Sequence, residues 1–254
     1  MRRAKSTLEN LGFEAVVAWG GDRGRFIFDA VPQGTGKVLD VGCAFGWALG
    51  DLRGKASELH GIDLDDAALE RARESYPEVS FRLASATDIP FGDQTFDAVI
   101  CSEVIEHVGD ANKAKLVSEI ARVLKPGGVL VFTAPHAGLL AWADPMDFKR
   151  RFTWLYRMYM RLSGYKPVDD LVAGHKHVSY REVLDYFGQS FEVEIVRFTG
   201  LLEPFLSWIL VVAERLRLLP RSVTTALNRF RAWESGIPCG KHMANSLRLR
   251  ARRS

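Results

Sequence analysis

The stretch KVLDVGCAFGWALGDL, residues 37–52, predicts a buried strand that turns tightly into a helix. Leu39 and Val41 flank Asp40 in an apolar run, and glycines at 42 and 46 then enclose three residues. In an open parallel sheet, a turn at the carboxyl end of a strand is where nucleotide-like ligands bind. The sequence therefore places a ligand site directly after this strand.

The composition is that of an ordinary globular chain. Of its 254 residues, 47% are hydrophobic and 26% charged, which fits one α/β domain with additions, and we expect a single domain over 1–254. Cys43, Cys101 and Cys239 share no CxxC spacing, so we expect buried thiols and neither a disulfide framework nor a zinc site. Residues 1–17 contain no apolar core of signal-peptide length, which predicts a cytoplasmic protein.

Strand and helix patterns alternate between residues 37 and 134. We expect strands at 37–42, 57–63, 79–85, 95–104 and 129–135, and helices from the first turn to about 53, at 65–76 and at 112–124. Units of this length predict a parallel sheet with helices on both faces.

The regular alternation ends after Pro135. We expect an N-terminal helical segment over 1–36, a helical lid over 139–171, a helix at 179–188 and a strand at 191–200. A helical insertion over 200–235 follows. The tail from 243 alternates leucine and arginine, which predicts a final strand that pairs with 191–199.

The first turn alone does not identify its ligand, because dinucleotide dehydrogenases also carry a glycine-rich turn. Asp40 stands two residues before Gly42, and no GxGxxG can be written across 42–47. Asp63 ends the second strand, where a carboxylate can accept both hydroxyls of a ribose. That position serves nicotinamide and sulfonium cofactors alike, so it supports an adenosine ligand without choosing between them.

Four segments together resemble the class I S-adenosylmethionine-dependent methyltransferases: VLDVGCAFG, HGIDLDDAAL, SATDIPFGDQTFDAVICSEVIEHV and IARVLKPGGVLVFTAPH. The resemblance is strong over about 20–138 and looser over 175–200. It implies an α/β, Rossmann-like fold with a seven-stranded, mostly parallel sheet, an antiparallel last strand and helical insertions. It also implies that the cofactor is S-adenosyl-L-methionine and that no metal is needed. A nicotinamide-dependent oxidoreductase is therefore the disfavoured alternative.

The resemblance also implies the residues that hold the cofactor. The loop after the first strand would pass under the methionine half, Asp63 would hold the ribose, and Leu64 would lie against the adenine. Ser85 and Ala86 would read the adenine edge with Asp88 nearby, while Ser102 would line the methionine end. We also expect Glu103 to approach the cofactor because it adjoins Ser102. The loop residues concerned are Asp40, Gly42, Cys43, Ala44 and Gly46.

This chain departs from the family at two of these positions. Ala44 stands where the family usually has glycine, and Ser85 where it often has aspartate. We expect a negative φ at Ala44, where a methyl group costs little. The two departures keep open an alternative, a non-catalytic binding or scaffold protein with the methyltransferase fold.

The acceptor side is less defined. His107 and His136 follow predicted strands and are the candidate general bases, with His175 and His177 in a later segment. The loose likeness of the helical insertions to bacterial enzymes implies O-methylation of a small, lipid-like or lipid-linked glycan acceptor.

Aromatic and basic residues mix in 139–171, and an apolar run follows in 200–235. These segments form either a lid over the site or helices at an anionic membrane surface, on the inner face of the membrane. Nucleic acid is disfavoured because no separate RNA-binding module is present. The sequence leaves the oligomeric state open.

Overall fold

The computed structural model describes residues 13–139, 141, 154, 176–202, 205–206, 209–210 and 219–254. Apart from 139, 141 and 154, the predicted lid over 139–171 therefore lies outside the described residues, and so does His175. The same holds for much of 200–218 and for the first twelve residues of the predicted N-terminal segment.

The elements follow the alternation that the sequence predicts. The strands are β1 (Thr35–Val41), β2 (Ala56–Asp63), β3 (Ser80–Leu83), β4 (Phe96–Ser102), β5 (Leu124–Pro135), β6 (Phe191–Thr199) and β7 (Ser246–Arg253). The helices are α1 (Phe13–Ala30), α2 (Trp47–Asp51), α3 (Asp66–Ser75), α4 (Asp110–Val123), α8 (Tyr180–Phe187) and α10 (Arg221–Glu234), with a 3-10 turn, η1, at Ile105–His107.

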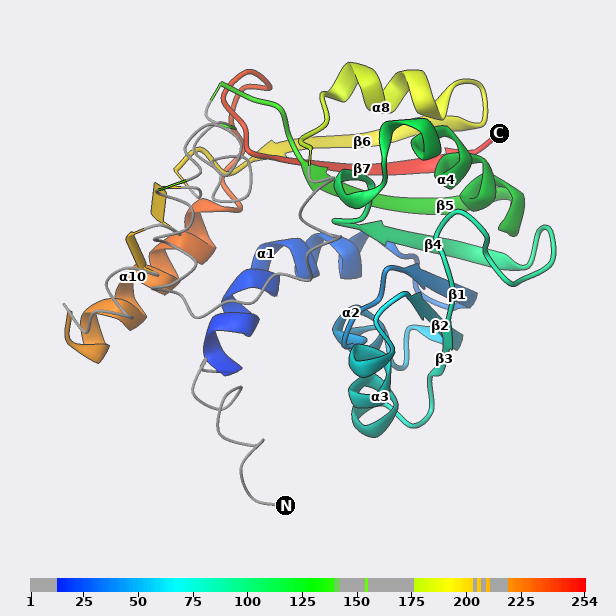
Figure 1. The fold of residues 1–254 in the computed structure, drawn as a ribbon, viewed down its shortest axis with the longest axis horizontal. Helices are drawn as coiled ribbons and strands as arrows, with labels where there is room; N and C mark the ends of the chain where they lie inside the picture. The colour runs from blue at the N-terminus through cyan, green and yellow to red at the C-terminus, as the bar shows by residue number, and fades with distance from the viewer. Residues whose placement is uncertain are drawn as a thin grey trace.

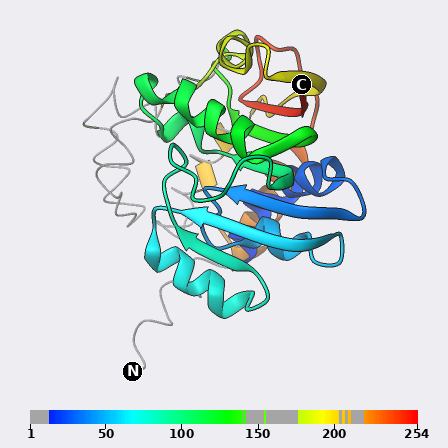
Figure 2. The same cartoon turned by 90° about the vertical axis from the view of Figure 1, so that its right-hand side faces the viewer.

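The seven strands form one sheet in the order β3-β2-β1-β4-β5-β7-β6 (Figure 1). The pairs among β1 to β5 are parallel, whereas β7 runs antiparallel to both β5 and β6. The predicted fold class is thus confirmed, including the pairing of the arginine-rich tail with 191–199. Figure 2 shows helices on the two sides of this sheet.

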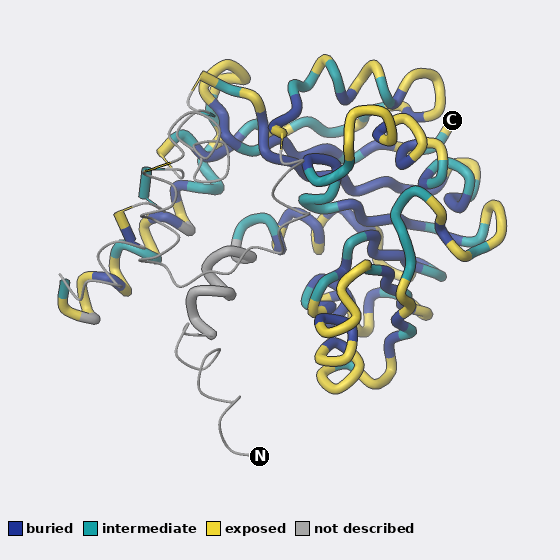
Figure 3. The backbone as a smooth tube through the Cα atoms, in the orientation of Figure 1, coloured by how far each residue is buried: buried dark blue, intermediate teal, exposed yellow. Residues whose placement is uncertain are grey.

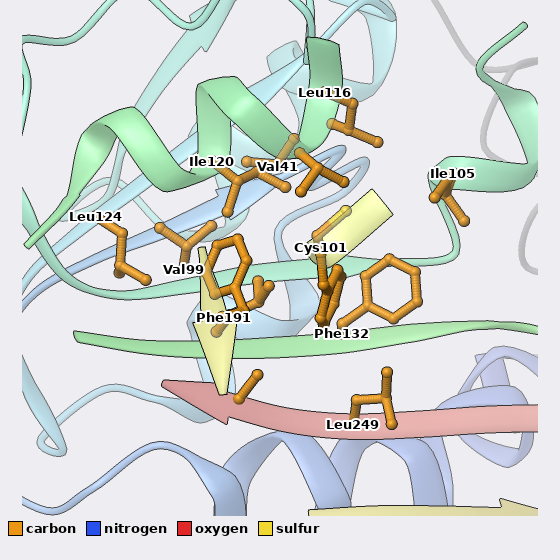
Figure 4. Close-up of a cluster of buried hydrophobic side chains, with 14 of the residues drawn as sticks. Val41, Val99, Cys101, Ile105, Leu116, Ile120, Leu124, Phe132, Phe191 and Leu249 are labelled. Carbon is orange, nitrogen blue, oxygen red and sulfur yellow. The ribbon is translucent and has the colours of Figure 1, made fainter. Parts of the chain in front are cut away.

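Each face of the sheet has its own hydrophobic core because side chains alternate along a strand. Leu39, Val99 and Phe132 pack with residues of α4 and α8 on one face. Figure 4 shows Val99 and Phe132 in this core together with Leu116 and Ile120 of α4. Val38, Ala98 and residues of α1, α2 and α3 pack on the other. Figure 3 shows the central strands buried along most of their length. The two cores fix the strand ends on which the site depends.

The arginines of β7 are engaged within the protein. Leu247, Leu249 and Ala251 are buried in the sheet, while Arg250 and Arg252 pair with Glu194 of β6 at 2.8 and 2.7 Å. The basic alternation in this tail therefore belongs to the sheet's own charge pairing and not to an open anion-binding surface.

Arg248 ties β7 to the N-terminal helix. Its side chain is 3% exposed, pairs with Asp22 of α1, and donates to the carbonyl of Ser235 just after α10 at 3.0 Å. One buried guanidinium thus connects α1, β7 and the end of α10.

Among the described residues, no helix has the length and apolar character needed to cross a membrane.

Candidate active site

The strand order reverses direction between β1 and β4, and we call the carboxyl edge of the sheet at this switch point the crevice. From β1 the chain builds outward through β2 and β3, then returns to place β4 on the other side of β1. Ligands of open α/β sheets bind at such a switch point, at the carboxyl ends of the strands. Val41, Asp63 and Ser102 are the last residues of β1, β2 and β4, so all three lie at this edge.

The loop after β1 is held against β2. The amides of Gly42 and Cys43 both donate to the carbonyl of Ile62, at 2.8 and 3.0 Å. Gly42 and Gly46 have φ of +73° and +75°, which glycine adopts without steric cost.

The protein's own packing also requires these two glycines. A Cβ at Gly42 would lie 2.4 Å from a methyl carbon of Val104, and one at Gly46 would lie 2.7 Å from the ring of Phe81. Neighbouring side chains therefore leave no room for a Cβ at either position, whether or not a ligand also binds close to the loop.

Ala44 corrects one expectation. Its φ is +44°, not negative, so a residue with a side chain occupies the left-handed region. That conformation costs about 1–2 kcal/mol for an L-residue. The Ala44 amide donates to Asp63 Oδ2 at 2.8 Å, and this charge-assisted bond helps to hold the strained position.

Asp63 is oriented by backbone amides from both sides. Besides Ala44, the amide of Asp65 donates to its Oδ1 at 2.9 Å, and the residue is half-buried. Two carboxylate oxygens have room for about four hydrogen bonds, so acceptor capacity remains for a pair of sugar hydroxyls. Leu64, next to it, is 68% exposed and offers an apolar surface for a base.

Acidic side chains gather beneath this crevice. Asp40 is 4% exposed, and no hydrogen bond to its carboxyl comes from the described residues. Burial, and then the charge of Asp63, raise the pKa of Asp40 to about 8. Burial also raises the pKa of the Cys101 thiol, and the charges of Glu106, Asp40 and Glu103 contribute to this rise.

The thiol of Cys43 is shifted in the same direction as that of Cys101. It is buried, and burial followed by the charges of Asp40 and Asp63 raises the pKa of its thiol. Cys239, in contrast, is only half-buried, which corrects the expectation that all three thiols are buried.

The segment predicted to read the adenine edge lies beside β2. The amide of Ala84 donates to the carbonyl of Asp63 at 3.0 Å, which holds this segment next to residue 63. The hydroxyl of Ser85 lies 2.9 Å from that of Thr87, while Asp88 is exposed. Within the described chain the Ala86 amide makes no hydrogen bond, so it is available to a ligand.

A chain of hydrogen bonds orders the end of β4. The hydroxyls of Ser102 and Thr133 lie 2.9 Å apart, and Thr133 donates to Glu103 Oε1 at 2.8 Å. Glu103 itself has a φ of +58°, and its amide donates to the carbonyl of Thr133 at 3.0 Å. Its carboxylate is therefore fixed at the switch point.

His136 sits inside the fold rather than at an open surface. It is 5% exposed, and its Nδ1 and Nε2 lie 3.2 and 2.8 Å from the carbonyl oxygens of Val178 and Lys241. Burial lowers the pKa of His136, against the opposing effect of these carbonyls. A neutral ring donates only one of these bonds, yet backbone oxygens cover both nitrogens.

The other described histidines differ in access. The His107 side chain is 32% exposed, and its Nε2 lies 3.8 Å from Glu106 Oε1. His177 is buried, with Nδ1 3.1 Å from the carbonyl of His136. His107 is thus the more accessible of the two candidate bases.

Sequence reasoning missed Arg23. This residue of α1 places Nη1 3.4 Å from Glu103 Oε2 and its guanidinium carbon 5.8 Å from the centre of the Trp47 ring. Arg23 precedes the first strand and belongs to no motif, so the sequence carries no signal that brings it to the site.

A cavity of about 360 Å³ lies away from this crevice, around the beginnings of β2 and β3. Arg53, Glu58, His60 and Glu78 line it, at the opposite ends of the strands from Asp63 and Ser102. The switch-point principle favours the carboxyl edge as the ligand site.

Nowhere in the described part do three or more His, Cys, Asp or Glu side chains group as a metal site would require.

These features fit a cationic adenosine ligand such as S-adenosylmethionine. Asp40 is a buried carboxyl to which no described residue donates a hydrogen bond, and Asp63 and Glu103 add acidic groups at the same edge. An acid-lined crevice favours a positively charged ligand such as a sulfonium. The fold and the crevice together define a Rossmann-like domain for a charged adenosine cofactor.

Comparison with known proteins places the chain more closely. The family described as "Methyltransferase domain" matches residues 39–132. The demethylmenaquinone methyltransferase of Bacillus licheniformis is 35% identical over 175 residues, covering 59% of this chain and 74% of that protein. The chain belongs to the class I S-adenosylmethionine-dependent methyltransferase family.

Other relatives match over shorter lengths. The ubiquinone biosynthesis O-methyltransferase of Thiobacillus denitrificans is 39% identical over 114 residues, 43% of this chain and 48% of that protein. The chain thus spans less than half the length of that relative.

A geranyl diphosphate C-methyltransferase from Streptomyces coelicolor, solved with S-adenosyl-L-homocysteine, has the same fold. It superposes with a TM-score of 0.57 at 16% identity, covering 91% of this chain and 77% of that one. S-adenosyl-L-methionine is the cofactor of the family.

Proposed function

We propose that this protein transfers a methyl group from S-adenosylmethionine to an oxygen of a small, lipid-like or lipid-linked acceptor. The observation that carries the proposal is the Asp63 carboxylate, held by two backbone amides above the buried Asp40. The quinone-directed names of two relatives support a lipid-like acceptor.

The protein's part in such a reaction is alignment. When bound, S-adenosylmethionine would supply an activated methyl group on a sulfonium for transfer to the acceptor oxygen, with S-adenosylhomocysteine as the leaving group. Asp63 and the loop 42–46 fix the cofactor, and holding the reactants in line at near-attack distance supplies much of the rate enhancement. The acceptor's hydroxyl proton leaves to a base within hydrogen-bond reach.

We assign the base to His107 and a positioning role to His136. His107 is about one-third exposed, whereas both nitrogens of His136 face backbone carbonyls. We expect His107→Gln to lower kcat by about 10²- to 10⁴-fold with little change in KM for the cofactor. The pH–rate profile provides the check, because the variant should lose the rise in rate with pH.

Cofactor binding is the first test. Isothermal titration of the wild type and of Asp63→Ala with S-adenosylmethionine and S-adenosylhomocysteine should show at least a tenfold loss in the variant, since charge-assisted bonds to the ribose disappear. Asp66→Asn, an exposed carboxylate in the first turn of α3, is the control and should bind normally. No binding to the wild type at millimolar ligand would remove the proposal.

The second candidate is a non-catalytic protein of the same fold. The strained Ala44 and the serine at 85 favour it, because both replace residues with which the family binds its cofactor. Incubation of the protein with methyl-labelled S-adenosylmethionine and fractionated host extract separates the two. Label in a lipid fraction supports the enzyme, whereas binding without any transfer supports the scaffold.

We propose that catalysis takes place at a membrane surface, and α10 supports this proposal. Val223, Phe230 and Trp233 on this helix are 39%, 42% and 64% exposed. Aromatic side chains of this kind suit a membrane interface, and this supports our proposal that the acceptor is met at an anionic membrane surface. Trp233→Ser should reduce co-sedimentation with anionic vesicles, whereas unchanged sedimentation would contradict it.

A further inference from the structure

The segment expected to read the adenine is fixed at both of its ends. At its start, the amide of Ala84 donates to the carbonyl of Asp63 at 3.0 Å. At its end, the amide of Ile89 donates to Oε2 of Glu119, a residue of α4, at 2.8 Å. Residues 85–88 therefore form a short bridge between β2 and α4, and the position of this bridge depends on both supports.

Arg122, about one turn further along α4, completes the second support. Its Nε and Nη2 lie 2.8 Å from Oε1 and Oε2 of Glu119, which is the paired contact of a guanidinium with a carboxylate. Nη2 also donates to the carbonyl of Ile89 at 2.9 Å, while Nη1 donates to the carbonyl of Phe91 at 2.8 Å and to Asp93 Oδ1 at 2.9 Å. We call Glu119 and Arg122 the α4 clamp.

The α4 clamp is charged and stands on a packed helix. The side chains of Glu119 and Arg122 are 16% and 31% exposed. Hydrogen bonds from Arg122 hold the pKa of Glu119 below its usual value, so the carboxylate is ionised at neutral pH. Leu116 and Ile120 bury the other face of this helix in the hydrophobic core. Groups on such an element position their partners more precisely than groups on a loop do.

Between the two supports the chain makes a tight turn. The amide of Asp88 donates to the carbonyl of Ser85 at 3.1 Å, and the amide of Thr87 donates to the Ser85 hydroxyl at 3.2 Å. The Ala86 amide has no hydrogen bond within the described chain. The turn thus presents one amide to a ligand, and the supports at either end set the direction of this amide.

We propose that the α4 clamp positions the adenine of the cofactor without touching it. Glu119 and Arg122 fix Ile89, and through it the turn, so that the Ala86 amide donates to the ring nitrogen N1 of the base. The two are positioning residues, because they act through the segment that they hold. The inference rests on the proposed function, since it takes this turn as the adenine site.

The competing explanation is that the α4 clamp only stabilises the fold. Isothermal titration with S-adenosylhomocysteine and S-inosylhomocysteine separates the two explanations, because these ligands differ in the base alone. Adenine N1 accepts a hydrogen bond, whereas N1 of hypoxanthine carries a hydrogen and cannot accept one. The ratio of the two dissociation constants therefore measures the reading of the base. A variant that is merely less stable weakens both ligands equally and leaves this ratio unchanged.

The wild type should prefer the adenosyl ligand by at least about tenfold, because the inosyl ligand leaves a donor unpaired. Arg122→Met should reduce this preference by about three- to tenfold, with less than about a twofold change in binding of the inosyl ligand. Arg122→Lys keeps the charge without the planar fork and should fall between Met and the wild type.

Ile120→Val is the matched control. Ile120 is buried on the same helix and belongs to the core, so its truncation lowers stability without changing the α4 clamp. This variant should keep the wild-type preference for the adenosyl ligand. Glu119→Gln is the second variant should Arg122→Met fail to fold. It weakens the contact with the guanidinium and should also reduce the preference.

An unchanged preference in the folded clamp variants would overturn the inference and leave Glu119 and Arg122 with a role in stability alone. A wild type that binds both ligands equally well would overturn it too, since the amide would then not read the base. Failure of the wild type to bind S-adenosylhomocysteine at millimolar concentration would instead remove the proposed function, and this inference with it.

Discussion

At the scale of single residues, backbone conformation separates what the sequence predicts from what it does not. The sequence gives the positions of the glycine loop, of Asp63 and of the strand-end residues, because motifs carry them. The φ of Ala44 and the contact between Arg23 and Glu103 depend on packing by distant segments. No local pattern predicts either.

Ala44 allows a direct test of its strain. Ala44→Gly should change the free energy of unfolding by between zero and about 1 kcal/mol in the stabilising direction. Relief of the left-handed strain outweighs the extra entropy of the unfolded chain. Ala114→Gly, at an exposed position in α4, should instead destabilise by about 1 kcal/mol. Urea titration measures both, and a loss at Ala44 as large as that at Ala114 would refute the argument.

Asp40 should make stability depend on pH. Its pKa is about 8 in the folded protein against 3.8 for an unperturbed carboxyl, so the folded state binds the extra proton between these values. Its stabilising contribution is therefore complete below about pH 4 and is lost as pH rises towards 8, with a slope of at most about 1.4 kcal/mol per pH unit.

Asp40→Asn should remove this contribution. Urea titrations at pH 5, 7 and 9 should show the wild type losing stability relative to the variant as pH rises. Parallel pH profiles for the two proteins would contradict the assignment.

At the scale of elements, the sequence predicts β1 to β5 and their helices well because periodicity is local. It also predicts the pairing of the tail with 191–199, since leucine and arginine alternate with the period of a strand. The docking of α1 is not predictable in the same way. It depends on Arg248 and Asp22, which are separated by most of the chain.

The link between α1 and β7 can be broken selectively. Arg248→Met should destabilise the protein by about 2 kcal/mol, because a charge-assisted bond is lost while the apolar volume is kept. Hydrogen exchange should increase in residues 22–30, while amides of α4 on the other face keep their protection. Uniform acceleration over both helices would show a global effect instead.

At the scale of the whole molecule, the proposed cofactor site joins parts that are far apart in the sequence. Residues of β2, the first loop, β4 and α1 lie at the switch point, so a ligand bound there would stabilise all of these elements together. The positive charge of the arginine-rich tail, in contrast, is partly neutralised by pairing with Glu194 within the sheet. Overall charge therefore predicts the partner less well than the strand-end motifs do.

Thermal unfolding should report this coupling. S-adenosylhomocysteine at about 100 times its Kd should stabilise the protein by about 2.7 kcal/mol, and so raise Tm by several degrees. NAD at the same concentration is the comparison and should leave Tm unchanged. A larger shift with NAD would favour the oxidoreductase alternative.

The position of β7 has a consequence for how the chain is made. β7 lies between β5 and β6, yet the ribosome produces it after both of them. While β7 is still inside the exit tunnel, β6 has no neighbour to join and the adjoining edge of β5 stays open. Nascent chains therefore pass through a stage in which β1 to β5 can pair while β6 has no partner strand, and chaperones that shield exposed strand edges would act at that stage.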